Sequence, residues 1–160
     1  MGRSRDPLAD VADLVPRVYS YVAYRIGGGP DAEDVTGDVF ERAIRYRNAY
    51  DPALGEPISW LLGIARRCIE TPGRTLPHSN GDLVEHSAPG ELESDSLRRL
   101  TVASAVARLD ERDRDLIALR YGSDLSAKQI ADLVGMKQNA VEVALHRARA
   151  RLREELSPDD

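Results

Sequence analysis

The sequence predicts an all-α protein made of two small helical domains joined by a flexible acidic linker. Apolar residues recur at three- and four-residue steps over most of the chain, which is the spacing of helices that bury one face. A stretch rich in Pro, Gly and acidic residues interrupts this pattern at residues 70–95. We expect the N-terminal domain at residues 6–71, the linker at residues 72–96 and the C-terminal domain at residues 97–156.

Composition limits the classes of protein to consider. With 42% hydrophobic and 31% charged residues among 160, a soluble chain with a buried core is expected. No apolar run approaches the ~20 residues of a membrane span, and no apolar stretch follows Arg3 and Arg5 as in a secretory signal. Cys68 is the lone cysteine, which excludes a disulfide framework or a multi-cysteine metal site. We therefore expect a cytoplasmic protein without a cofactor.

The net charge of −5 is unevenly distributed along the chain. Residues 1–69 carry a net charge of −1, residues 70–95 carry −5 and residues 96–160 carry +1. The acidic excess thus lies in the expected linker. The acidic average therefore does not argue against a nucleic-acid partner, because clustering of basic groups decides that question.

The first expected helix begins at Pro7, with Asp6 before it as the cap. Pro16 interrupts its apolar pattern, so we expect a kink or a break there. The glycines at 27–29 end the helix.

The second expected helix begins at Pro30 and carries acidic residues on the face opposite its apolar one. These are Asp31, Glu33, Asp34, Asp38 and Glu41. Such a self-repelling face suits a basic partner surface, although an ordinary solvated helix face has the same composition. A third helix is expected from Pro57 to just before Pro72, with Trp60 mainly in the core.

The C-terminal domain is expected to contain helices over 97–109 and 116–122, followed by a helix-turn-helix. Ser126 is suited to cap a short helix, and Gly135 lies at the turn, where a left-handed backbone is needed. The second helix runs from about Gln138. Its expected buried residues are Val141, Ala144, Leu145, Ala148 and Leu152.

The opening residues of that second helix point outward, where such a helix meets base edges. They are Lys137, Gln138, Asn139 and Glu142. Residues 137–153 hold five basic groups against one acid, which suits contact with phosphates. A plain helical hairpin with a solvated Arg-rich helix is the alternative interpretation.

The chain resembles the group IV, or extracytoplasmic-function (ECF), sigma factors of bacteria. The C-terminal resemblance lies in Leu119-Arg120-Tyr121, Ile130-Ala131, Val134-Gly135 and the run His146 to Arg153. The N-terminal resemblance lies in Asp31-Ala32-Glu33-Asp34-Val35 with Val39-Phe40 and Ala43, and in Trp60-Leu61-Leu62-Gly63-Ile64-Ala65-Arg66. It covers roughly residues 10–70 and 97–154, in the family's order. Departures from the family pattern at Gly37, Arg67 and Pro72 bear on promoter choice and melting.

The resemblance implies a subunit that carries RNA polymerase to promoters, with one domain like sigma region 2 and one like region 4. The residues implied at the −35 element are Lys137, Gln138, Asn139, Glu142, His146, Arg147 and Arg149. Those implied at the −10 element are Arg45, Arg47, Asn48, Tyr50, Arg66 and Arg67. Those implied to bind core polymerase are Asp31, Glu33, Asp34, Asp38 and Glu41.

The implied partners are promoter DNA and the clamp and flap of core polymerase, with an anti-sigma protein as a further candidate. Free of polymerase, the chain is expected to be a monomer. Residues 45–50 interleave cations, an amide and aromatic rings, which suits unstacked single-stranded DNA. The acidic linker either mimics RNA near its exit path or serves as a solubilising tether. The whole interpretation requires the helix over 138–153 to present a face to solvent or to a groove.

Two other functions were weighed. A DNA-binding regulator that never contacts polymerase shares the helix-turn-helix but leaves the acidic helix unexplained. An enzyme with an accessory DNA-binding domain needs chemistry that the sequence lacks, since it has no nucleophile–base pair and no phosphate loop. Adjacent acids at residues 31–34 point in different directions, which disfavours a Mg²⁺ site. His78 and His86 with Cys68 fit no compact metal site, so we interpret them as solvated loop histidines.

Overall fold

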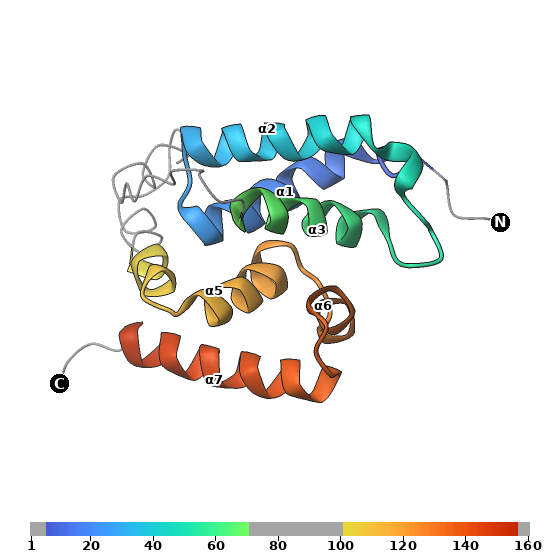
Figure 1. Ribbon diagram of the computed structural model, residues 1–160. Helices are drawn as coiled ribbons and strands as arrows, with labels where there is room; N and C mark the ends of the chain where they lie inside the picture. The colour runs from blue at the N-terminus through green and yellow to red at the C-terminus, as the bar shows by residue number, and fades with distance from the viewer. Residues whose placement is uncertain (1–5, 71–100, 157–160) are drawn as a thin grey trace.

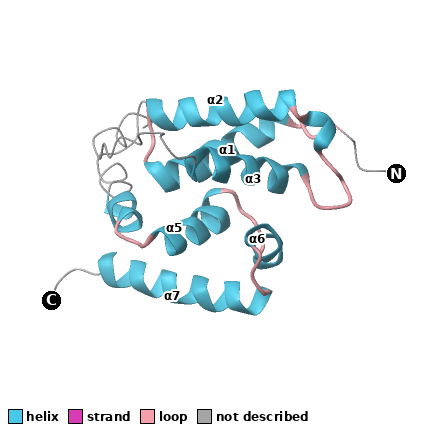
Figure 2. Cartoon of the chain, in the orientation of Figure 1, coloured by secondary structure: helices cyan, strands magenta, loops and turns pink. Residues whose placement is uncertain are grey.

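The computed structural model describes residues 6–70 and 101–156, here named the N-lobe and the C-lobe (Figure 1). The N-lobe contains α1 (Val11–Ile26), α2 (Pro30–Arg45), the short 3-10 turn η1 (Arg47–Ala49) and α3 (Pro57–Glu70). The C-lobe contains a helical segment over 101–107, then α5 (Glu111–Ile117), the π-helical turn η3 (Ala118–Gly122), α6 (Ala127–Val134) and α7 (Gln138–Leu156). All elements of the described residues are helical (Figure 2), which confirms the predicted fold class. The linker at 72–96 lies outside the described residues, as do its histidines.

The first helix begins later than predicted and is not divided at Pro16. Asp6 accepts a hydrogen bond from the backbone N–H of Leu8 at 3.0 Å, so Pro7 lies in a turn and α1 begins four residues later. Pro16 lies inside an unbroken helix. A proline removes one N–H donor, and burial of Leu14 and Val18 on either side of Pro16 compensates for this loss.

The N-lobe core forms where α1, α2 and α3 pack together. Apolar residues of α3 lie on the side of that helix that meets α1 and α2. Ile58, Leu61, Leu62 and Ala65 are all at most 2% exposed. Trp60 is half-buried and packs against this core, as the sequence predicts.

The C-lobe folds around a helix-turn-helix with the predicted local chemistry. Ser126 accepts from the N–H of Gln129, and the Gln129 side chain accepts from the N–H of Ser126, which completes a capping box. Gly135 adopts a left-handed conformation, with φ of 75°, at the end of α6. Val141, Leu145 and Ala148 are buried, while the predicted Ala144 and Leu152 are partly buried against the same core.

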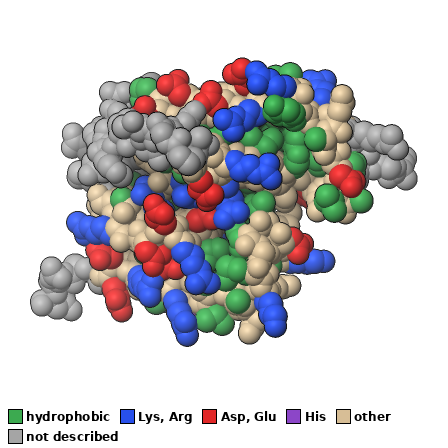
Figure 3. All heavy atoms as spheres, viewed as in Figure 1, with side chains coloured by type: hydrophobic (Ala, Val, Ile, Leu, Met, Phe, Trp, Pro, Cys, Tyr) green, Lys and Arg blue, Asp and Glu red, His purple; other side chains and the backbone are tan. Residues whose placement is uncertain are grey.

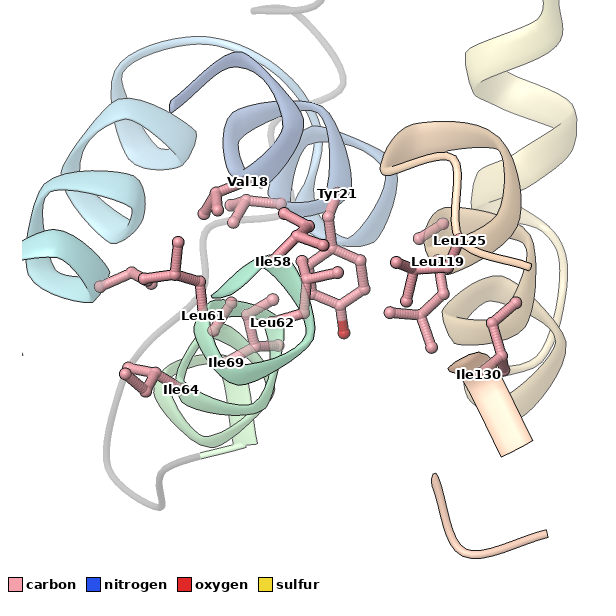
Figure 4. Packing of buried hydrophobic residues seen from close by; sticks show 14 of the residues in the cluster. Val18, Tyr21, Ile58, Leu61, Leu62, Ile64, Ile69, Leu119, Leu125 and Ile130 are labelled. Carbon is pink, nitrogen blue, oxygen red and sulfur yellow. The ribbon is translucent and has the colours of Figure 1, made fainter. Parts of the chain in front are cut away.

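The two lobes pack directly against each other, whereas the sequence suggests separate bodies on a tether. One face of α1 contacts η3 and α5, so α1 and α3 lie between α2 and the C-lobe (Figure 1). Tyr21 is fully buried and points from α1 toward Leu119 and Leu125 of the C-lobe (Figure 4). Because apolar residues of both lobes join in one cluster, hydrophobic burial favours the contact. Among the helices of the described ranges, none combines the length and apolar character needed to cross a membrane.

Candidate nucleic-acid interface

The outward face of α7 carries all the residues that the sequence assigns to the −35 element except Lys137, which directly precedes the helix. Gln138, Glu142, His146 and Arg149 follow one another at steps of four and three, so they form one row on the helix. All seven assigned residues, including Lys137 just before the helix, are exposed. Gln138 Nε2 donates to Glu142 Oε1 at 3.3 Å, which links two neighbours of that row. The helix thus buries one side in the C-lobe and leaves the other open.

The basic residues of α7 divide into two groups. Arg151 donates to Asp113 and lies 3.9 Å from Asp110, so this guanidinium connects α7 to α5. Within the described part of the chain, Arg147 and Arg149 form no ion pair. Lys and Arg side chains project from the edge of the molecule where α7 lies (Figure 3). Unpaired guanidinium groups on this face are suited to phosphates, because they lose no internal partner on binding.

The −10 candidates lie in two settings. Arg45, Arg47 and Asn48 are exposed around η1, and Arg45 pairs with Glu41 at 3.4 Å in an exposed ion pair of little energetic value. The loop after η1 carries Leu54, whose side chain is 85% exposed. Tyr46 is 56% exposed beside Arg45. Sequence analysis did not assign Leu54 or Tyr46 individually, although Tyr46 belongs to the basic and aromatic stretch that it identified.

Tyr50, which the sequence assigns to the −10 element, is largely buried in the loop after η1. Its side chain is turned into the loop and only 8% of the residue is exposed. The hydroxyl donates to the carbonyl oxygen of Gly55 at 2.8 Å, and the ring centroid lies 5.6 Å from that of Trp60. Because both ends of the side chain have partners, Tyr50 shapes the loop instead of presenting a free ring.

Arg66 also departs from the predicted set, because it is directed at the C-lobe. Its Nε donates to Asp115 Oδ2 at 3.1 Å, and 24% of its side chain is exposed. Arg67, the next residue, is exposed on another side of α3. The structure therefore does not gather all six −10 candidates on one open surface.

Helix α2, which carries the acidic residues, lies on the far side of the N-lobe from α7 (Figure 1). Asp31, Asp34, Asp38 and Glu41 succeed one another at steps of three and four residues along the helix. Glu33, Asp34 and Glu41 are exposed, while Asp31 and Asp38 are half-buried. The packing of α2 against α1 and α3 leaves this face uncovered by the C-lobe.

Sequence reasoning missed the residues that join the lobes, above all Tyr21 and Asp115. The Tyr21 hydroxyl donates to Asp115 Oδ1 at 2.5 Å, and Arg25 donates to the same carboxylate oxygen at 2.8 Å. Burial and then the Asp115 charge raise the pKa of Tyr21 well above its ordinary value. Burial acts to lower the pKa of Arg25, but Tyr21 and Asp115 act to raise it, and the net shift is upward. An acidic residue directly before the apolar run Leu116–Leu119 was the available signal for Asp115.

Both lobes of the chain match known protein families. Residues 11–71 match the family described as Sigma-70 region 2, and residues 99–152 match Sigma-70, region 4. The ECF RNA polymerase sigma factor SigD of Mycobacterium bovis is 30% identical over 171 residues, covering 95% of this chain and 78% of that protein. The chain belongs to the ECF sigma factors of the sigma-70 family. The predicted family is therefore confirmed.

Other relatives of this sigma factor agree with the assignment. BldN of Streptomyces coelicolor, an ECF RNA polymerase sigma factor, is 28% identical over 99% of this chain, which spans 61% of BldN. Among solved structures, the sigma factor RpoE of Bartonella quintana, in complex with the anti-sigma factor NepR, matches with a TM-score of 0.73 at 22% identity, covering 98% of this chain and all of that one. That likeness shows the fold. Members of the family are non-catalytic and serve RNA polymerase in promoter recognition and transcription initiation.

Proposed function

We propose that this sigma factor directs core RNA polymerase to promoters, with α7 reading the −35 element and the N-lobe opening the −10 element. The observation that carries the proposal is the outward face of α7, which is exposed over all seven assigned residues. A recognition helix must offer side chains to the major groove while its other side is held by its own domain. The burial of Val141, Leu145 and Ala148 meets the second requirement.

The side chains at the start of α7 have the chemistry to read bases. Gln138 and Asn139 each offer an amide that can pair bidentately with adenine, and Glu142 can accept from the amino group of cytosine. The hydrogen bond from Gln138 to Glu142 orients both groups before DNA arrives. Arg147 and Arg149 then supply contacts to the phosphate backbone.

The N-lobe surface around η1 is suited to a separated strand. Arg45, Arg47 and Asn48 can follow the backbone, while the exposed Tyr46 ring offers a surface on which a base can stack. Leu54 adds an apolar contact at the loop that follows. We assign Tyr50 to holding that loop in shape, because its hydroxyl and ring are both engaged there.

The acidic face of α2 is our candidate surface for core polymerase. Its exposed carboxylates would be neutralised by a basic surface, which also steers the two proteins together at low salt. An anti-sigma protein is a further candidate partner, because the similar RpoE structure contains the anti-sigma factor NepR.

Run-off transcription with reconstituted core polymerase on a promoter library tests the proposal. We expect the chain to select a subset of promoters that core polymerase alone does not use. Replacing Asn139 with Ala should relax the preference at one −35 position by ~1–3 kcal/mol. Arg149→Ala should weaken binding to all sequences and lower the salt slope by about one.

Arg151→Ala is the matched control, since this Arg lies on the same helix but is paired within the C-lobe. Its salt slope should stay near that of the parent. Failure of the chain to co-purify with core polymerase would contradict the proposal and favour a regulator that binds DNA alone.

A further inference from the structure

The two lobes are joined through the carboxylate of Asp115. Tyr21 and Arg25 of α1 both donate to Oδ1, at 2.5 Å and 2.8 Å, and Arg66 of α3 donates to Oδ2 at 3.1 Å. The side chains of Asp115 and Arg25 are only 10% and 8% exposed. Three side chains of the N-lobe therefore donate hydrogen bonds to one buried carboxylate of the C-lobe. We call Tyr21, Arg25, Arg66 and Asp115 the Asp115 cluster.

Other contacts follow the same boundary between the lobes. Arg17 donates twice to the carbonyl oxygen of Ser123, at 3.0 Å and 2.8 Å, and the Ser123 hydroxyl donates back to the Arg17 carbonyl at 2.7 Å. Gly122 lies so close to α1 that a Cβ there would stand 3.2 Å from the Tyr21 Cα. The two lobes therefore pack closely along α1.

The closed arrangement is too small to reach both promoter elements. A compact chain of this length has a radius of gyration of about 15 Å and so a diameter of about 40 Å. Elements centred at −35 and −10 are about 25 base pairs apart, which is about 85 Å of duplex. The residues between Glu70 and Thr101 can span at most about 100 Å. Two-site binding therefore requires that the lobes separate.

Resting on the proposed function, we propose that the Asp115 cluster fastens a closed state that withholds Arg66 from promoter DNA. While the lobes are closed, the Asp115 carboxylate pairs with the Arg66 guanidinium, and α5 covers part of that side chain. When they separate, the Arg66 guanidinium becomes available to the −10 strand together with Arg67 on the same helix. In the closed state the described C-lobe does not pack on α2, so polymerase can engage the acidic face without displacing that lobe.

The experiment compares full-length Asp115→Asn with the parent by small-angle X-ray scattering and by binding to a forked −10 promoter fragment. Asp124→Asn is the matched control, since it removes the same charge from the C-lobe at a side chain that is 88% exposed. We expect a larger radius of gyration and at least threefold tighter promoter binding for Asp115→Asn, and no change for the control. An unchanged radius of gyration would overturn the proposal that the Asp115 cluster holds the lobes together. A larger radius without tighter binding would overturn the withholding of Arg66.

Arg66→Gln should change promoter binding in the direction opposite to Asp115→Asn. It breaks the same ion pair, so it should also enlarge the chain, but it should weaken promoter binding because the cation is lost. Tighter promoter binding by this variant would overturn the second role of Arg66. Should Asp115→Asn lose its helical circular dichroism, Arg25→Gln removes a donor of the same cluster from the N-lobe, and we expect it to give the same enlargement. The scattering results test the closed state alone. If Asp115→Asn is larger than the parent but the parent fails in run-off transcription, the proposed function is refuted and the role of the Asp115 cluster stands.

Discussion

Asp113 and Asp115 lie two residues apart on α5 and have the same exposure, yet they hold different parts of the molecule together. Each has a side chain that is 10% exposed and accepts from arginine. Asp113 faces α7 and meets Arg151, whose side chain is 57% exposed. Asp115 faces the N-lobe and meets Arg25, whose side chain is 8% exposed. One short helix therefore carries a contact within a domain and a contact between domains.

The difference shows that the burial of an acid does not by itself reveal what the acid stabilises. The exposure of the arginine partner decides how much stability is lost when the aspartate is removed. An exposed arginine is solvated by water after the loss, whereas a buried arginine is left without a partner. Variants of the two aspartates, and of residues belonging to one lobe alone, can test this contrast.

Replacing Asp115 with Ala should lower the free energy of unfolding by ~3 kcal/mol, because the variant must either bury Arg25 without its carboxylate or lose the contact between the lobes. Asp113→Ala should cost only ~1 kcal/mol, because Arg151 remains largely in water. Urea unfolding followed by circular dichroism measures both values. Equal losses for the two variants would remove the contrast drawn above.

Alkaline pH should weaken the contact between the lobes. Burial raises the pKa of Tyr21, so the buried phenol stays protonated where the same phenol ionises in the unfolded chain. Its contribution is fully present below about pH 10 and is lost as the pH rises further, at ~1.4 kcal/mol per pH unit. Tyr24 has a pKa raised by burial as well, so the comparison needs a variant. Stability curves of Tyr21→Phe and the parent between pH 8 and pH 11 should diverge above pH ~10, and parallel curves would contradict the assignment to Tyr21.

Ser126→Ala should cost ~1 kcal/mol, because it removes the side chain that completes the capping box of α6. Its effect belongs to the C-lobe alone. If the lobes unfold together, a single urea transition shifts to lower concentration. Two transitions, with only one of them shifted, would show that the contact at Asp115 does not couple the lobes.

Gly37→Ala should raise the free energy of unfolding by ~0.5–1 kcal/mol. Gly37 lies inside α2 and is exposed, and a Cβ built on it would meet nothing within 4 Å. Alanine therefore gains helix propensity without a clash, and the gain belongs to the N-lobe alone. Thermal unfolding checks it, and a lowered midpoint would indicate a contact of Gly37 that this packing lacks.

The parts of the fold that depend on local chemistry could be predicted from the sequence. Ser126 and Gly135 are suited to a cap and to a left-handed turn in any context, so the bounds of α6 followed from them. The spacing of Val141, Leu145 and Ala148 likewise predicted which side of α7 is buried. The family's residue patterns were enough to predict the family itself.

Features that depend on distant partners could not be predicted in this way. Tyr21 and Asp115 are 94 positions apart, and neither sequence neighbourhood specifies the other. Tyr50 resembled an open ring because its partner, the Gly55 carbonyl, becomes available only once the loop has folded. Pro16 does not divide α1, and the burial of Leu14 and Val18 on either side of it offsets the loss of one hydrogen bond.

Trp60 provides this chain with an intrinsic optical probe. It is the sole tryptophan of the sequence, it is half-buried, and its ring lies 5.6 Å from the ring of Tyr50. Light absorbed by Tyr50 can therefore pass to Trp60, whose emission depends on the polarity around the loop between η1 and α3. Fluorescence of the unlabelled chain should report when a strand or a protein reaches that loop.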